Sequence, residues 1–144
     1  MKKLQVIGLV ACLAMLLAFI GFGCAGTASG SNSGGGGGGA VAATVQMTGS
    51  HSFSPINVTV PAGKAVQWQN IDTAHHTVAS DTSLTGFNSD PAFPTGLAGG
   101  ESYTFTVPAG TPSGTILYYH CEFHGAAGNG QTLGQGMAGS ITVQ

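Results

Sequence analysis

Short apolar runs that alternate with polar residues fill the chain from Val41 onward, and this period of two is the feature that most limits its fold. In the run 102–107 every second residue is apolar, so Tyr103, Phe105 and Val107 are expected to face a core. Gly and Pro separate the runs, and no stretch keeps a helical period. About seven short strands at this spacing predict an all-β protein built as a two-sheet sandwich.

The same pattern gives approximate strand positions. Val66 with Trp68, and Ile141 with Val143, repeat the alternation and are expected to point inward. The segment 81–100 contains several Pro and Gly residues and is expected to be mainly a connection, with one helical turn or a short irregular strand as alternatives. The sequence predicts strands over 43–48, 56–60, 65–69, 76–80, 102–107, 115–121 and 139–143.

The first 24 residues have the pattern of an export signal. Two lysines follow Met1, and the run 4–22 is almost wholly apolar. Cys24 follows a small residue, as in bacterial lipoprotein processing sites, so lipid on Cys24 is expected; an uncleaved signal anchor is the alternative, because the apolar run is long enough to span a membrane. Either reading predicts a membrane-anchored protein of the periplasm or cell surface.

Residues 25–40 are rich in Gly and Ser and include six consecutive glycines. Such a composition cannot form a core, so a flexible tether is expected there, and residues 41–144 are expected to form the folded domain. Beyond the N-terminus the one basic residue is Lys64. Since phosphate binding draws on several Lys and Arg contacts, nucleic acid is excluded as a partner.

Cys121 is the residue that calls for a chemical explanation. If Cys12 leaves with the signal and Cys24 takes lipid, Cys121 is the remaining thiol in a chain sent to a disulfide-forming compartment. His124 follows it by three residues, and Met137 comes after a Gly-rich loop. A thiolate, two imidazoles and a weakly bound thioether favour copper that cycles between its two oxidation states.

The second imidazole must come from another part of the chain. His75 and His76 are adjacent, and strand alternation places His76 on the face of Val78, which is expected to be the core side. His76 is therefore the expected ligand and His75 the alternative. His51 and His120 have no partner at ligand spacing and are expected to be ordinary surface or edge histidines.

The pieces of this pattern, taken in order, resemble the plastocyanin, amicyanin and halocyanin group of cupredoxins. The similarity runs from about residue 45 to 143 and includes four segments in the order of that group. It implies a Greek-key sandwich that holds one type 1 copper ion, with His76, Cys121, His124 and Met137 as ligands, and carries single electrons. The matching segments are 52–63, 66–70 with 76–78, 119–124 and 137–143.

The segment from His120 to Met137 departs from this group in two ways. Twelve residues separate His124 from Met137, several more than the group usually has, so Gln131 or Gln135 is an alternative axial ligand. His120 directly before Cys121 has no explanation in the sequence.

The resemblance also implies how the protein would work. His124 would lie near the surface as the point of electron entry, and Thr77 is a candidate to fix the loop of Cys121 by hydrogen bonding. Partners would be redox proteins such as a c-type cytochrome or a membrane oxidoreductase, bound transiently to a monomer with few charges. A copper-delivery protein, a copper enzyme and a metal-free sandwich are the rival hypotheses, and the single domain with few unassigned histidines argues against the enzyme.

Overall fold

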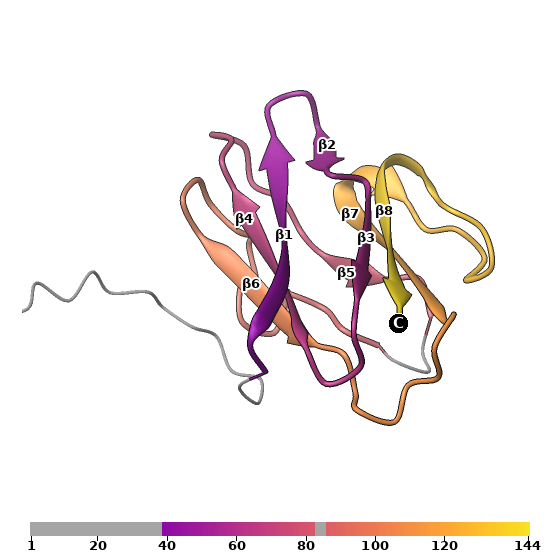
Figure 1. Ribbon diagram of the computed structural model, residues 1–144. Coiled ribbons are helices and arrows are strands. Elements are labelled where there is room, and N and C mark those ends of the chain that lie inside the picture. Colours follow the sequence, from indigo (N-terminus) through magenta and orange to yellow (C-terminus); the bar gives the residue numbers. More distant parts are fainter. Residues whose placement is uncertain (1–38, 83–85) are drawn as a thin grey trace, which may run out of the picture. The chain divides into compact units, whose positions relative to one another are not determined.

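The computed structural model describes residues 39–82 and 86–144, and these ranges form eight strands (Figure 1). The expected signal and nearly all of the expected tether lie outside the described residues. No helix within the described ranges is long and apolar enough to cross a membrane. The strands are β1 (Val41–Thr48), β2 (Ser52–Ser54), β3 (Asn57–Val60), β4 (Ala65–Asn70), β5 (Ala79–Ser80), β6 (Ser102–Thr106), β7 (Ile116–Ala126) and β8 (Gln135–Val143).

The strands make two four-stranded sheets, with strand orders β2-β1-β4-β6 and β3-β8-β7-β5. Most connections carry the chain from one sheet to the other, and the pairs β1 with β4 and β3 with β8 are parallel. The other pairs are antiparallel. The all-β two-sheet sandwich predicted from the sequence is confirmed, because sheets that are apolar on one face bury those faces against each other.

The core between the sheets is aromatic at its centre. Trp68 is fully buried and packs edge-on against Tyr119 at a ring-centroid distance of 5.2 Å. Phe87 stacks on Trp68 at 5.6 Å, and Phe53 meets Tyr119 at 4.9 Å. Such pairs contribute beyond the area that they bury, so this cluster ties the two sheets together.

The residues expected to face inward do so. Val66, Trp68, Val107, Ile141 and Val143 are buried, and Tyr103 and Phe105 are partly buried and pack against the core. Alternation along a strand is a local property, because successive side chains point to opposite faces of a sheet. It could therefore be predicted from the sequence without knowledge of the strand partners.

Strand ends differ from the expectation where they depend on pairing. The predicted strand 76–80 is reduced to β5, and His76 makes only an isolated bridge with Leu97. β2 was not expected as a separate strand, and it exists because it pairs with β1. β7 runs beyond Cys121 to Ala126 because β8 continues beside it.

The strand directions bring the turn after β1, the loop after β4 and the β7–β8 connection to one end of the sandwich (Figure 1). β1, β4 and β7 end there and β8 begins there, as the contacts between their loops described below show. The turn after β1, the loop after β4 and the segment between β7 and β8 hold most of the residues with metal-binding chemistry. The fold thereby brings together side chains that are far apart in the sequence.

Candidate metal centre

Three side chains form a group that can hold a metal ion, His76, Cys121 and His124. The Nδ1 atoms of the two histidines are 3.1 Å apart, and they lie 3.8 and 3.5 Å from the Cys121 Sγ atom. The point equidistant from these three atoms is about 2.0 Å from each, close to the roughly 2.0–2.3 Å of bonds from first-row metal ions to imidazole and thiolate. The triangle therefore has the size that one such ion requires.

His76 is fixed by the loop that follows β4. Its backbone exchanges two hydrogen bonds with Leu97, with N–O distances of 3.1 and 2.7 Å. The buried Asn70 side chain donates to the carbonyl oxygens of Ala74 and Leu97 and accepts from the Asp72 backbone N–H. Asn70 thus satisfies the backbone groups of an irregular loop and sets the place of His76.

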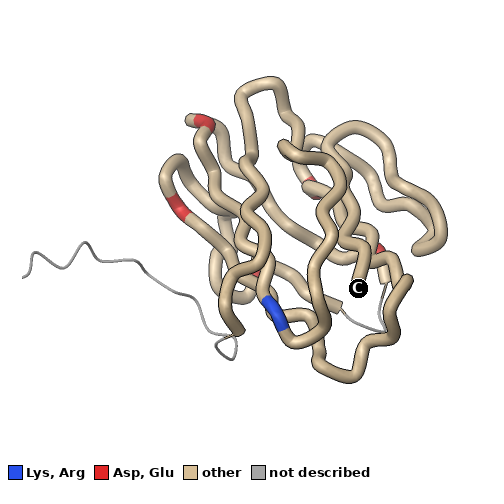
Figure 2. Tube along the Cα trace, in the orientation of Figure 1, with Lys and Arg blue, Asp and Glu red and all other residues tan. Residues whose placement is uncertain are grey.

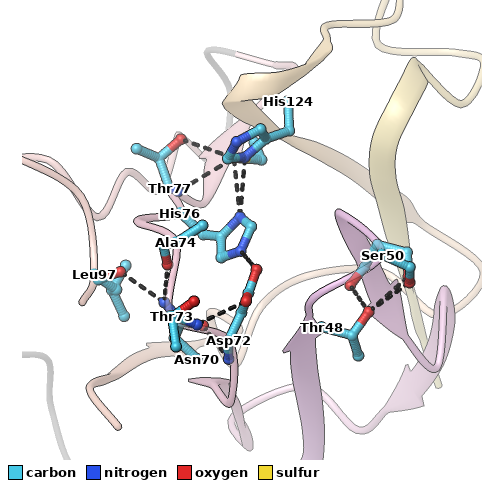
Figure 3. A network of polar contacts seen from close by, with 12 residues as sticks. Thr48, Ser50, Asn70, Asp72, Thr73, Ala74, His76, Thr77, Leu97 and His124 are labelled. Carbon is cyan, nitrogen blue, oxygen red and sulfur yellow. Dashed lines mark hydrogen bonds and ion pairs between the residues drawn. The ribbon is translucent and has the colours of Figure 1, made fainter. Parts of the chain in front are cut away.

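The other ring nitrogen of His76 contacts a carboxylate. Its Nε2 atom lies 3.1 Å from Asp72 Oδ2, an acceptor, so Nε2 donates this hydrogen bond (Figure 3). Its Nδ1 atom, without a proton, lies 3.8 Å from the Cys121 sulfur. Figure 3 shows His76 between Asp72 on one side and His124 on the other. The bond to His76 is the main cause that lowers the pKa of Asp72 below its ordinary value. A carboxylate in this place orients a metal-binding imidazole and raises its basicity.

Cys121 is fully buried where β7 departs from regular pairing with β8. The Thr77 backbone N–H points at its sulfur at 3.4 Å, and the Thr77 hydroxyl accepts a hydrogen bond from the Glu122 N–H at 2.8 Å. Thr77 therefore fixes the backbone beside Cys121, as the sequence predicted.

Met137 lies on β8 opposite this irregular part of β7. The ladder pairs His120 with Ala138 and Gly125 with Gly136, so Met137 faces the segment between them that carries Cys121 and His124. Its side chain is fully buried, whereas Gln131 and Gln135, the alternative axial ligands, are exposed.

Two glycines make the close approach of β7 and β8 possible. A Cβ on Gly125 would meet the Met137 carbonyl oxygen at 2.5 Å, and Gly136 has a φ of 69°, which side chains rarely adopt. These positions explain in part why the segment before Met137 is rich in Gly. They also set the backbone of Met137 against the segment that carries the other candidate ligands.

The long connection between β7 and β8 is attached through a buried carboxylate. Asp81 Oδ1 lies 2.6 Å from His120 Nδ1, and its Oδ2 accepts a hydrogen bond from the Gly128 N–H at 2.7 Å. The Asp81 side chain is fully buried and that of His120 is 12% exposed. The expectation that His120 is an ordinary histidine is wrong, because it binds the carboxylate that anchors the loop.

The remaining two histidines differ in their surroundings. His75 is exposed and its Nδ1 atom lies 2.9 Å from the Thr95 carbonyl oxygen, so the structure places His76 rather than His75 in the triangle. His51, in the turn after β1, stacks on His124 with ring centroids 4.1 Å apart. His51 is exposed, as the sequence predicted, but its ring contacts a candidate ligand. Burial, and then the nearby His51 and His76, lower the pKa of His124.

Sequence reasoning missed the residues that support the triangle. Asn70, Asp81 and His51 act through contacts with segments distant in the sequence, whereas Asp72 contacts His76 within one loop, four residues away. The one available signal was that polar residues stand close to His76 in the chain. In the described ranges, the triangle is the one group of three or more His, Cys, Asp or Glu side chains able to hold a metal.

Comparison with known proteins adds the family to this geometry. The profile of copper binding proteins of the plastocyanin/azurin family matches residues 40–144, which is most of the chain. The matched range contains all four residues of the candidate centre.

Among solved structures, part of a nitrite reductase and an amicyanin mutant give the same fold. Part of a copper-containing nitrite reductase from Thermus scotoductus SA-01 shares 25% sequence identity with this chain and superposes with a TM-score of 0.51. The match covers 73% of this chain and 22% of the reductase. An amicyanin mutant in its oxidized state is 19% identical with a TM-score of 0.50, and 74% of this chain and 83% of that one are covered. A purple cupredoxin from Nitrosopumilus maritimus is 23% identical with a TM-score of 0.49, covering 71% and 99% of the two chains.

Proposed function

This chain belongs to the plastocyanin/azurin family of copper binding proteins, and we propose that it carries single electrons between redox partners through one copper ion. The observation that carries the proposal is the triangle of two imidazole nitrogens and one cysteine sulfur, of the size that one ion requires. We assign His76, Cys121 and His124 as its ligands and Met137 as the axial ligand. Two imidazoles, a thiolate and a weak thioether are the donor set of electron-transfer copper sites.

The residues around the ligands limit how far the donors can move. Copper bound there would gain and lose one electron, between its divalent and monovalent states. His76 is held by Asp72 and by the loop that Asn70 organises, while Thr77 holds the backbone beside Cys121. Because these contacts do not involve the ion, they keep nearly the same donor positions in both oxidation states. Small rearrangement of the donors favours rapid electron transfer.

His124 supplies the proposed point of electron entry. It is the least buried residue of the triangle, and the neighbouring Phe123 is 54% exposed. Figure 2 shows a single basic position and scattered acidic positions along the described chain. A surface with so few charges gives little electrostatic steering, so docking would depend on brief apolar contact.

We further propose where the carrier works and with what. The apolar N-terminal run and Cys24 support export and attachment to a membrane, at the periplasmic or outer side. The partners would then be redox proteins of that compartment, such as a c-type cytochrome or a membrane oxidoreductase.

A carrier explains the centre better than an enzyme does. The copper nitrite reductase shows that this fold also occurs within an enzyme, but the match covers 22% of that chain. Within residues 39–82 and 86–144 only one group of metal-binding side chains is present, and three of its candidate ligands are deeply buried. Direct attack on a substrate at the ion would need an open coordination position.

The test is the visible spectrum of the purified protein with one equivalent of Cu(II), before and after ascorbate. An intense absorption band that disappears on reduction and returns on reoxidation is the expected result, because thiolate-to-copper charge transfer requires Cys121 bound to Cu(II). Colourless Cu(II) binding by folded protein would refute the electron-carrier proposal and favour copper delivery.

Replacing Asp72 by Asn is expected to raise the reduction potential of the copper centre. The variant removes the anionic acceptor of the His76 Nε2–H, which makes His76 a weaker electron donor to the ion. The binding of divalent copper is weakened more by this than the binding of monovalent copper. Loss of such a partner typically weakens metal binding by roughly 10- to 100-fold. Voltammetry of wild type and variant measures the shift, and Glu101→Gln is the control at a carboxylate bonded to the Ala98 N–H. An unchanged or lower potential in Asp72→Asn would contradict the role of Asp72.

A further inference from the structure

We propose that His51 is a positioning residue that holds the ring of His124 against the copper centre by stacking. The two rings are nearly parallel, with an interplanar angle of 7° and centroids 4.1 Å apart. The same His51 ring meets His76 edge-on at 6.0 Å. One side chain from the turn after β1 thus contacts both histidines of the triangle. The inference rests on the proposed ligand role of His124.

The two histidines of the triangle are supported in different ways. The His76 ring is fixed on its outer side by the carboxylate of Asp72 and is fully buried. For His124, the polar contacts found among the described residues are made by Nδ1, to Cys121 and His76 of the triangle. A ring held through Nδ1 alone can rotate or swing outward. The stacked ring of His51 gives His124 the outer support that Asp72 gives His76.

The backbone of His51 indicates that its position is imposed by its surroundings. Its φ is 51°, the one positive value at a residue other than Gly in the described ranges. Few residues other than Gly adopt this region, and such strain occurs where the structure around it fixes the conformation, often at functional sites. The strained residue here is the one whose ring covers His124.

A network of hydroxyl groups holds the turn in this conformation. The Thr48 hydroxyl lies 2.9 Å from the hydroxyls of both Ser50 and Ser52, which are 2.8 Å from each other. The His51 N–H donates to the Thr48 carbonyl oxygen at 2.9 Å. Figure 3 shows the contacts between Thr48 and Ser50. The turn therefore presents the His51 ring from a backbone that is bonded on both sides of it.

The consequence concerns the stability of copper binding. Copper leaves a protein by breaking one ligand bond at a time, and His124 is the least buried member of the triangle. A ring stacked on His124 opposes the outward movement that begins this release. An aromatic pair contributes enough to slow such a step by roughly 2- to 10-fold.

Two variants of the full-length protein separate the ring of His51 from its backbone. His51→Gly removes the ring and suits the positive φ, so the fold should keep its thermal stability or gain some. His51→Phe keeps an aromatic face without ring nitrogens. We measure the rate of Cu(II) transfer to excess EDTA from the decay of the charge-transfer band, and we expect release from His51→Gly to be roughly 2- to 10-fold faster and from His51→Phe close to wild type. If His51→Gly does not fold, His51→Asn replaces it, because Asn tolerates the same backbone.

A second measurement uses the metal-free protein. In wild type, the ring-proton NMR signals of His124 should carry the upfield shift caused by a stacked aromatic ring, and His51→Gly should remove that shift. Equal release rates in wild type and His51→Gly, or equally fast release from His51→Gly and His51→Phe, would overturn the inference while the copper band itself remains. A wild-type protein without the band would refute the proposed function, and the inference with it.

Discussion

Replacing Cys121 by Ser should abolish the intense visible absorption of the copper-loaded protein while the fold is retained. The Cys121 sulfur is the one thiolate donor of the triangle, and charge transfer from sulfur to Cu(II) gives such a band. Ser has nearly the same shape, and the Thr77 N–H that points at the sulfur can donate to the new hydroxyl instead. The measurements are the absorption spectrum and circular dichroism of wild type and variant with one equivalent of Cu(II).

The control for this variant is Thr77→Val, which leaves the thiol in place but removes the hydroxyl that accepts from the Glu122 N–H. This control should keep the band, with a changed reduction potential. Competition with a chelator should also show that Cys121→Ser binds Cu(II) more weakly, because the neutral hydroxyl of Ser is a poorer donor to this ion than a thiolate. A band of full intensity in Cys121→Ser would rule out the assigned ligand set.

Replacing Asp81 by Ala should lower the free energy of unfolding by about 1–3 kcal/mol, the cost of leaving buried hydrogen-bond donors without their acceptor. The Asp81 carboxylate is fully buried and bonds both His120 on β7 and the Gly128 N–H in the connection to β8. Its loss leaves these two donors without their acceptor. Urea denaturation of the metal-free protein, followed by Trp68 fluorescence, measures the effect.

A double-mutant cycle with His120→Ala isolates the Asp81–His120 contact. The double variant should be less destabilised than the sum of the two single variants, because removing both partners leaves neither side of this contact unsatisfied. Additive losses would show that Asp81 acts on the loop through Gly128 alone. Copper binding should weaken in Asp81→Ala as well, since the loop that Asp81 anchors leads into Met137.

The alternation of apolar and polar residues made the fold class predictable. Successive residues of a strand face opposite sides whatever their partner strand is, so Trp68, Val107 and Ile141 could be assigned to the core from local pattern alone. Strand lengths could not, because β2, the shortened β5 and the extended β7 depend on which strands lie beside them. Pairing of distant segments has no local signature.

The candidate donors were predictable for a different reason. Cys121 and His124 are three residues apart, and a Cys in a chain predicted to be exported needs a chemical role or a partner. Strand alternation favoured His76 over His75 and gave the right residue, although His76 lies outside β5 and Thr77 is as buried as His76. His51 is exposed, as expected, and His120 is not an ordinary surface residue, but the contacts of both were missed for one reason. Their partners, His124 and Asp81, are distant in the sequence.

The sequence by itself therefore determined the kind of fold and the chemical types of the donors, since both follow from residue identity and short spacing. Only the tertiary structure decided how those donors are held. The Asp72 carboxylate lies behind His76 because Asn70 organises the loop after β4, and Asp81 bonds His120 because β5 pairs with β7. The His51 ring lies over His124 because the turn after β1 meets the end of β7. Contacts between loops depend on strand direction and sheet packing, which no short stretch of sequence contains.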